Sequence, residues 1–173
     1  ISSPVRITAQ TPCFPPGQSV SPNAGTLTPK VSFNCTGLAN ILLEAAPDGN
    51  AVLPNGYQTI YILTSGPNYV IRQTGPVASF SVSGNNAYHI HGLVYDPATF
   101  DVTTLVPHVT TLAAVNATLV QGGGTICASL DMTGAAFTVN RPVLGALTAV
   151  SSTVCAPTGT ATVEAIPDGN ANV

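Results

Sequence analysis

The sequence predicts an all-β protein that consists of antiparallel β-sandwich repeats, one complete and one partial. From residue 25 onward, short segments rich in Val, Ile, Thr and Tyr alternate with turn residues, at a spacing of about 8–12 residues that is typical of sandwiches. Residues 25–51 also return as residues 145–171, and twelve of these 27 positions are identical. An internal repeat of this kind indicates units that pack mainly against their neighbours.

The N-terminal part, residues 1–21, is rich in proline and shows neither helical nor strand periodicity. Its segment 11–17 reads Thr-Pro-Cys-Phe-Pro-Pro-Gly, which excludes a helix or a central strand because proline lacks the backbone N–H that both require. We therefore expect an extended N-terminal arm. A β-type segment inside this arm is our candidate assembly strand, and it consists of Val5, Arg6, Ile7, Thr8 and Ala9.

Residues 22–107 are predicted to form one complete sandwich. The β-type segments within this range are 26–33, 39–46, 57–64, 68–73, 77–83, 87–95 and 101–106. Seven strands in about 80 residues is the number found in an immunoglobulin-like domain. Residues 57–63 carry apolar side chains on both alternating faces, which predicts a central strand that is packed on both sides.

The next segment, residues 108–141, is interpreted as a linker with a short helix or hairpin. Leu112, Val115 and Leu119 fall at helical spacing, and three glycines at 122–124 end the pattern. A partial second repeat then occupies residues 142–173. Because this second copy breaks off just after its turn, we expect either a longer array of units or a partner that completes the last unit.

The charge and the apolar runs of the sequence argue against nucleic acid and the membrane as partners. Only 6% of the residues are charged although 45% are hydrophobic, so the surface is neutral and rich in hydroxyl groups, which favours self-association. Four basic residues are scattered singly, and this excludes electrostatic binding of nucleic acid. No apolar run approaches the roughly 20 residues that a membrane helix needs, so membrane insertion is not expected.

Four cysteines fit an oxidising compartment and a secreted protein. The pairing that we favour is Cys13–Cys35 with Cys127–Cys155, because each bond closes a local loop of roughly 20–30 residues and stabilises the fold by about 3 kcal/mol. The alternative is four buried free thiols.

His89 and His91 are the residues whose spacing most resembles a metal site. Side chains at i and i+2 on a strand point to the same face, as two metal ligands do in cupins and copper oxidases. The further ligands of those sites are missing, so the preferred interpretation is two strand histidines and no metal. Glu44 and Glu164 are the only glutamates and are repeat equivalents, which argues against a pair of catalytic carboxylates. We expect neither an enzyme nor a cofactor.

Several sequence strings resemble a known repeat. They are residues 23–28 (NAGTLT), 56–67 (GYQTIYILTSGP), 91–99 (HGLVYDPAT) and 122–131 (GGGTICASLD). They are similar to the immunoglobulin-like tandem repeats of very large secreted surface proteins of Bacteroidota. The resemblance covers most of residues 22–173 and implies an exported adhesin or filament protein. That family usually has a further cysteine before its Ala-Gly-Thr-Leu motif, a position that Cys13 takes here and that has no counterpart before Gly145.

The expected function is therefore structural. We expect a repeat unit of an extracellular filament or adhesive surface stalk, which assembles with neighbouring subunits by β-strand complementation or edge pairing. The alternative is a glycan-binding β-sandwich module of a secreted surface protein, with surface glycans as partners. Neutral loops suit this alternative, but the chain has no Trp, and its tyrosines fall mostly within predicted strands.

Overall fold

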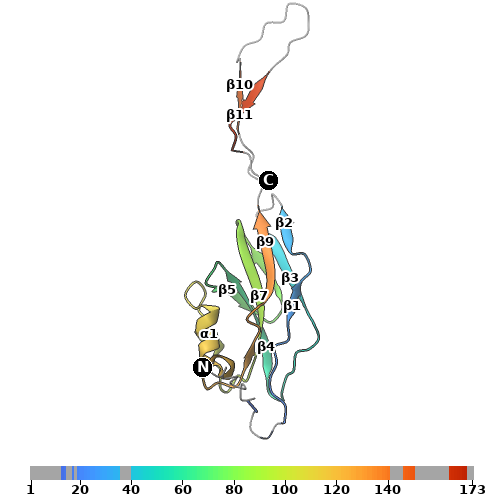
Figure 1. The fold of residues 1–173 in the computed structure, drawn as a ribbon, viewed down its shortest axis with the longest axis vertical. Coiled ribbons are helices and arrows are strands. Elements are labelled where there is room, and N and C mark those ends of the chain that lie inside the picture. The colour runs from blue at the N-terminus through green and yellow to red at the C-terminus, as the bar shows by residue number, and fades with distance from the viewer. Residues whose placement is uncertain are drawn as a thin grey trace, which may run out of the picture.

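The computed structural model describes residues 13–14, 17, 19–35, 40–140, 146–150 and 164–170, and it is built mostly of β-strands (Figure 1). The strands are β1 (Leu27–Pro29), β2 (Phe33–Cys35), β3 (Ile41–Pro47), β4 (Gln58–Ser65), β5 (Val70–Gly75), β6 (Ser79–Val82), β7 (Asn86–Tyr95), β8 (Ser129–Leu130), β9 (Ala135–Asn140), β10 (Leu147–Ala149) and β11 (Ala165–Pro167). The helical elements are α1 (Leu112–Thr118) and two 3₁₀ turns, Val102–Thr104 and Val120–Gly122. The all-β class predicted from the sequence is confirmed.

Two β-sheets pack face to face and form the body of the protein. The smaller sheet has the strand order β1-β3-β6, and the larger has the order β2-β9-β7-β4-β5, with β8 paired beside β7. The parallel pair is β2 with β9, and the other strand pairs are antiparallel. An inner hydrophobic cluster joins the two sheets, and its members include Leu27, Leu43, Phe80, Leu63, Ile90 and Phe137.

The outer face of the larger sheet is buried as well. A second hydrophobic cluster lies there, between the sheet and α1 with its neighbouring loops (Figure 1). The sheet contributes Ile62 and Leu93 to it, and α1 contributes Leu112 and Val115. Strand β4 therefore buries Leu63 in the inner cluster and Ile62 in the outer one, which confirms the predicted central strand that is packed on both sides.

Two of the predicted strands differ from those observed. Segment 26–33 is divided into β1 and β2, because the chain leaves the smaller sheet after Pro29 and joins the larger sheet at Phe33. The prediction of a strand over 101–106 is wrong. Asp101 accepts a hydrogen bond from the Thr103 backbone N–H at 2.9 Å and so begins a 3₁₀ turn.

Residues 108–141, interpreted as a linker, contribute α1, β8 and β9 to the packed body. The expected short helix is present as α1, where the Thr111 side chain accepts a hydrogen bond from the Ala114 N–H. Strand β9 pairs with β7 and alternates buried with exposed side chains. It lies in the body because Phe137 and Val139 complete the inner cluster. Strands β8 and β9 therefore belong to the larger sheet, and α1 covers its outer face.

Cys13 and Cys127 form a disulfide, with their Cα atoms 5.5 Å apart and a sequence separation of 114. The favoured pairing of Cys13 with Cys35 and of Cys127 with Cys155 is therefore wrong. The prediction assumed that each disulfide closes a short loop, but the fold brings Cys13 against Cys127 in the loop before β8. Cys155 and the side chain of Cys35 lie outside the described residues.

Replacing Cys13 and Cys127 together by serine is expected to lower the free energy of unfolding by about 2–5 kcal/mol, because a long loop is released in the unfolded chain. Chemical denaturation of the oxidised protein and the double variant measures this difference. Proteolytic peptides of the unreduced protein should contain Cys13 linked to Cys127. A peptide that links Cys13 to Cys35 would contradict the assignment.

Candidate functional site

The two histidines singled out by the sequence lie together on β7. Their rings are stacked with centroids 6.0 Å apart, which confirms that they share one face of the strand. Tyr69 packs edge-on against both rings, with centroids 4.9 Å from His89 and 5.7 Å from His91. Tyr69 itself has a positive φ of 47°, a conformation that non-glycine residues seldom adopt. The arrangement is a compact aromatic group on the outer face of the larger sheet.

Both ring nitrogens of the fully buried His91 are used within the protein. Nδ1 lies 2.9 Å from the backbone oxygen of Asp131, and Nε2 lies 3.0 Å from Oγ1 of Thr64. Because a carbonyl can only accept, Nδ1 donates, and Nε2 accepts from the threonine hydroxyl. Burial lowers the pKa of His91 to about 4, and the nearby Asp131 opposes this shift only in part. His91 is thus a neutral structural residue.

The geometry gives no support to a metal site at His89 and His91. His91 has no free lone pair for a metal, because one nitrogen donates and the other accepts a hydrogen bond. In the described ranges, no group of three or more His, Cys, Asp or Glu side chains is placed to hold a metal ion. The preferred interpretation, two strand histidines, describes the observed contacts.

Sequence reasoning missed the residues that hold His91 in place. Oδ1 of Asp131 accepts hydrogen bonds of 3.0 Å from the backbone N–H groups of Thr133 and Gly134, which forms a tight turn. Gly134 has a φ of +65°, and a Cβ atom there would lie 2.5 Å from Nδ1 of His91. The Asp-x-x-Gly spacing was the available signal for the turn, but only the fold shows that the turn faces the imidazole.

The internal repeat forms the same local structure twice. In the first copy, β1 pairs with β3 so that Leu27 lies opposite Pro47. In the second copy, β10 pairs with β11 so that Leu147 lies opposite Pro167. Both copies are antiparallel, and every paired position is displaced by the same number of residues as the sequence repeat. The repeated sequence therefore encodes a repeated strand pair. We call β10 and β11 together the second strand pair.

The turn after each pair repeats as well. The Asp48 N–H donates to the Thr26 oxygen and the Asp168 N–H to the Ala146 oxygen, both at 3.0 Å. Each aspartate then accepts a hydrogen bond of 2.9 Å from the backbone N–H two residues later. The glycine between has a positive φ in both copies. The Pro-Asp-Gly-Asn string thus forms the same turn in both copies, in each case bonded to the residue that precedes the paired strand.

Burial is what distinguishes the two copies. Leu27 is 6% exposed, whereas its equivalent Leu147 is 71% exposed. Ala45 is buried and its equivalent Ala165 is exposed. Strand β3 pairs with β6 on its second edge, whereas β11 has β10 as its sole partner in the part of the chain that the structure describes. The second strand pair is drawn apart from the two sheets in Figure 1. Its apolar side chains are exposed, and among the described residues the second edge of β11 has no paired strand.

The candidate assembly strand, Val5 to Ala9, lies outside the described residues. Across the described ranges, no helix has the length and apolar character needed to cross a membrane. Comparison with protein-family models, with curated proteins and with solved structures gives no match for this chain. The functional argument therefore depends on the chain's own geometry.

The free energy of unfolding should depend on pH through His91. Well above pH 6.5, from about pH 7.5 upwards, the imidazole is neutral in both states. As the pH falls from about 6.5 towards 5, the unfolded chain takes up a proton that buried His91 does not, so stability should drop by about 1.4 kcal/mol per pH unit. Denaturation curves at several pH values measure this slope, to which His89 adds because burial lowers its pKa too. The variant His91→Gln should lose the part of the slope that His91 contributes. Titration of the folded-state His91 ring above pH 5 by NMR would contradict the prediction.

The pKa of Asp48 should rise in the variant Thr26→Val. The backbone N–H of Asn50, followed by the Thr26 hydroxyl and the Asn50 side chain, holds this pKa at about 2 by donating hydrogen bonds to the ionised carboxylate. Removing the hydroxyl removes one donor. Carboxyl chemical shifts in an NMR titration report the change, and Asp168 in the same sample is the internal control that should stay unchanged.

Proposed function

We propose that this chain is a structural repeat unit of an extracellular filament or adhesive surface stalk, in which neighbouring units complete one another by β-strand pairing. The observation that carries the proposal is the second strand pair. It has the backbone pairing and turn of the first copy, but the apolar residues that the first copy buries are exposed in it.

The strand order supports an immunoglobulin-like interpretation of the complete unit. The smaller sheet, β1-β3-β6, corresponds to strands A, B and E of such a domain, and the sequence β9-β7-β4 in the larger sheet corresponds to G, F and C. The helical cover on the outer face is an addition to this plan. Domains of this kind are common building units of surface proteins, which is the setting that the resembling repeats suggest.

The second strand pair has two reasons to acquire a partner. Among the described residues, no strand pairs with the outer edge of β11, and backbone N–H and C=O groups on such an edge readily accept a further strand. The face with Leu147 and Ala165 is apolar, and covering one leucine side chain contributes about 1.5–3 kcal/mol. In the first copy β6 and the larger sheet provide both kinds of contact. We propose that strands of a neighbouring unit provide them in the second.

Two properties of the whole chain agree with an extracellular assembly. The Cys13–Cys127 disulfide is of the kind that persists in oxidising compartments. The low charge of the chain leaves little electrostatic repulsion between copies. Residues 5–9 of a neighbouring copy remain our proposed donor strand.

The chain should form fibres or larger oligomers at rising protein concentration, and Leu147→Ser should weaken this assembly roughly tenfold or more, because an apolar contact of the interface is lost. Sedimentation velocity measures the assembly, and negative-stain electron microscopy shows its form. Val77→Ser is the matched control, since Val77 is 60% exposed on the body.

Dispersed monomers at every concentration would contradict the proposal, and so would equal effects of the two serine variants. Deleting residues 1–12 tests the donor strand separately. Assembly that survives this deletion but is lost in Leu147→Ser would assign the interface to the second strand pair and exclude the N-terminal arm as donor.

A further inference from the structure

A polar cavity of about 340 Å³ lies between the edge strands of the two sheets, β5 and β6. Gln73 on β5 bridges the sheets here, because its Nε2 donates a 2.9 Å hydrogen bond to the backbone oxygen of Ser81 on β6. The lining also includes Asn40, Ser83, Asn86 and Arg72. Unlike the histidine group, this cavity is open to solvent, so its polar side chains are available to a ligand.

A β-bulge directs Arg72 into this cavity. Leu63 on β4 lies opposite Gln73, and the next residue, Thr64, lies opposite Ile71, so Arg72 is an extra residue in β5. In a regular strand the neighbours Arg72 and Gln73 would point to opposite faces. The bulge removes this alternation locally, and both side chains line the cavity.

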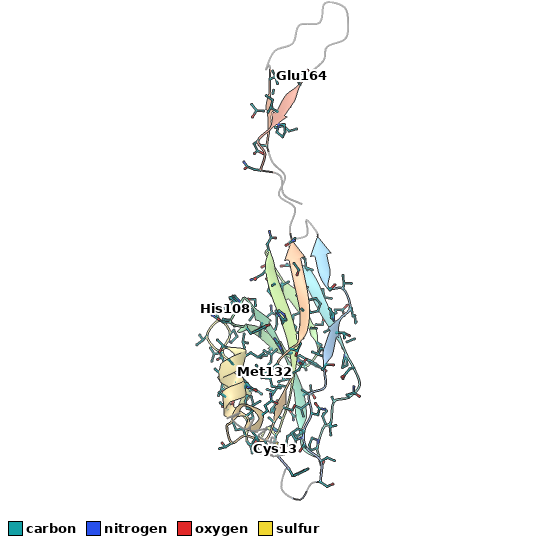
Figure 2. All side chains as sticks on the ribbon, in the orientation of Figure 1. Cys13, His108, Met132 and Glu164 are labelled. Atoms are coloured by element: carbon teal, nitrogen blue, oxygen red, sulfur yellow. A yellow bond between two sulfur atoms is a disulfide. The ribbon has the colours of Figure 1, made fainter. Side chains whose placement is uncertain are left out.

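The guanidinium of Arg72 is held in place from two sides. Its Nε donates to Oγ of Ser65 and its Nη1 donates to Nδ1 of His108, both at 2.6 Å. His108 adopts a φ of +64° and is held by its own N–H, which donates to the Ile71 oxygen at 2.8 Å. Such a strained non-glycine backbone is often found at binding sites. Figure 2 labels His108 on the flank of the body, level with β5.

No carboxylate neutralises Arg72 within the described residues. The salt bridge found there is between Lys30 and Glu44, and the cavity lining contains neither Asp nor Glu. Arginine carries five N–H donors, and two of them are used in the bonds to Ser65 and His108. A fixed, partly buried cation with remaining donors is suited to a planar carboxylate, which guanidinium groups bind in a two-point fashion.

We propose that this cavity binds a small sugar that bears a carboxylate, such as a hexuronic acid. The carboxylate pairs with Arg72, and the amides of Asn40 and Asn86 and the hydroxyl of Ser83 hydrogen-bond the sugar hydroxyls. The volume is at the small end of ligand sites, which suits about one sugar ring. The site is separate from the second strand pair, so it stands or falls independently of the assembly proposed above.

The test is a titration of the oxidised, full-length chain with D-glucuronate, followed by calorimetry and by NMR of the Arg72 and His108 side chains. We expect saturable binding that shifts both signals. Arg72→Gln should weaken it at least tenfold, and Arg72→Lys, which keeps the charge but loses the planar fork, should weaken it less. Lys30→Gln is the matched control, because it removes one positive charge elsewhere and should retain affinity within about twofold.

Several outcomes would overturn the proposal. The absence of saturable binding at millimolar D-glucuronate would exclude the site. Equal affinity for D-glucose would exclude a role for the carboxylate, and equal or tighter binding of inorganic phosphate would exclude the sugar. A loss in Lys30→Gln as large as that in Arg72→Gln would assign the effect to net charge. Should Arg72→Gln fail to fold, the comparison of Arg72→Lys with Lys30→Gln decides the question.

Discussion

The structure depends on the burial of its larger sheet on both faces. Strands β4 and β7 lie at the centre of this sheet, and their alternating side chains enter two separate hydrophobic clusters. A sheet of this kind needs a cover on each side, since apolar side chains on either face would otherwise meet water. The smaller sheet covers one face, and α1 with its loops covers the other. This requirement explains why α1, β8 and β9 are packed onto the body.

The repeated strand pair separates local from tertiary determinants within one molecule. The same residues produce the same register, the same turn and the same carboxylate hydrogen bonds in both copies. Side chains such as Leu27 and Leu147 nevertheless differ almost completely in exposure. Pairing between neighbouring strands is thus a local property of this sequence, whereas burial depends on what other strands supply. The proposed assembly follows from that difference.

The two polar regions of the body illustrate how similar residue types take different roles. His91 is buried and has both ring nitrogens occupied by Thr64 and Asp131, so it fixes the packing and offers nothing to a ligand. Arg72 and His108 are oriented just as firmly, but they line an open cavity. A bulge in β5 accounts for the difference, because it moves one side chain out of the regular alternation. Accessibility, rather than residue chemistry alone, distinguishes the structural group from the proposed site.

The sequence by itself determined the all-β class, most strand positions, the short helix, the shared face of His89 and His91, and the repeated turn. Each of these depends on alternation, helical spacing or turn residues within a few positions of one another. Tertiary structure alone decided that Cys13 pairs with Cys127 and that β9 joins the larger sheet. It also decided which polar residues surround Arg72. These features bring together residues far apart in the chain, and the choice among such contacts is made by the packing of whole sheets, which local patterns do not encode.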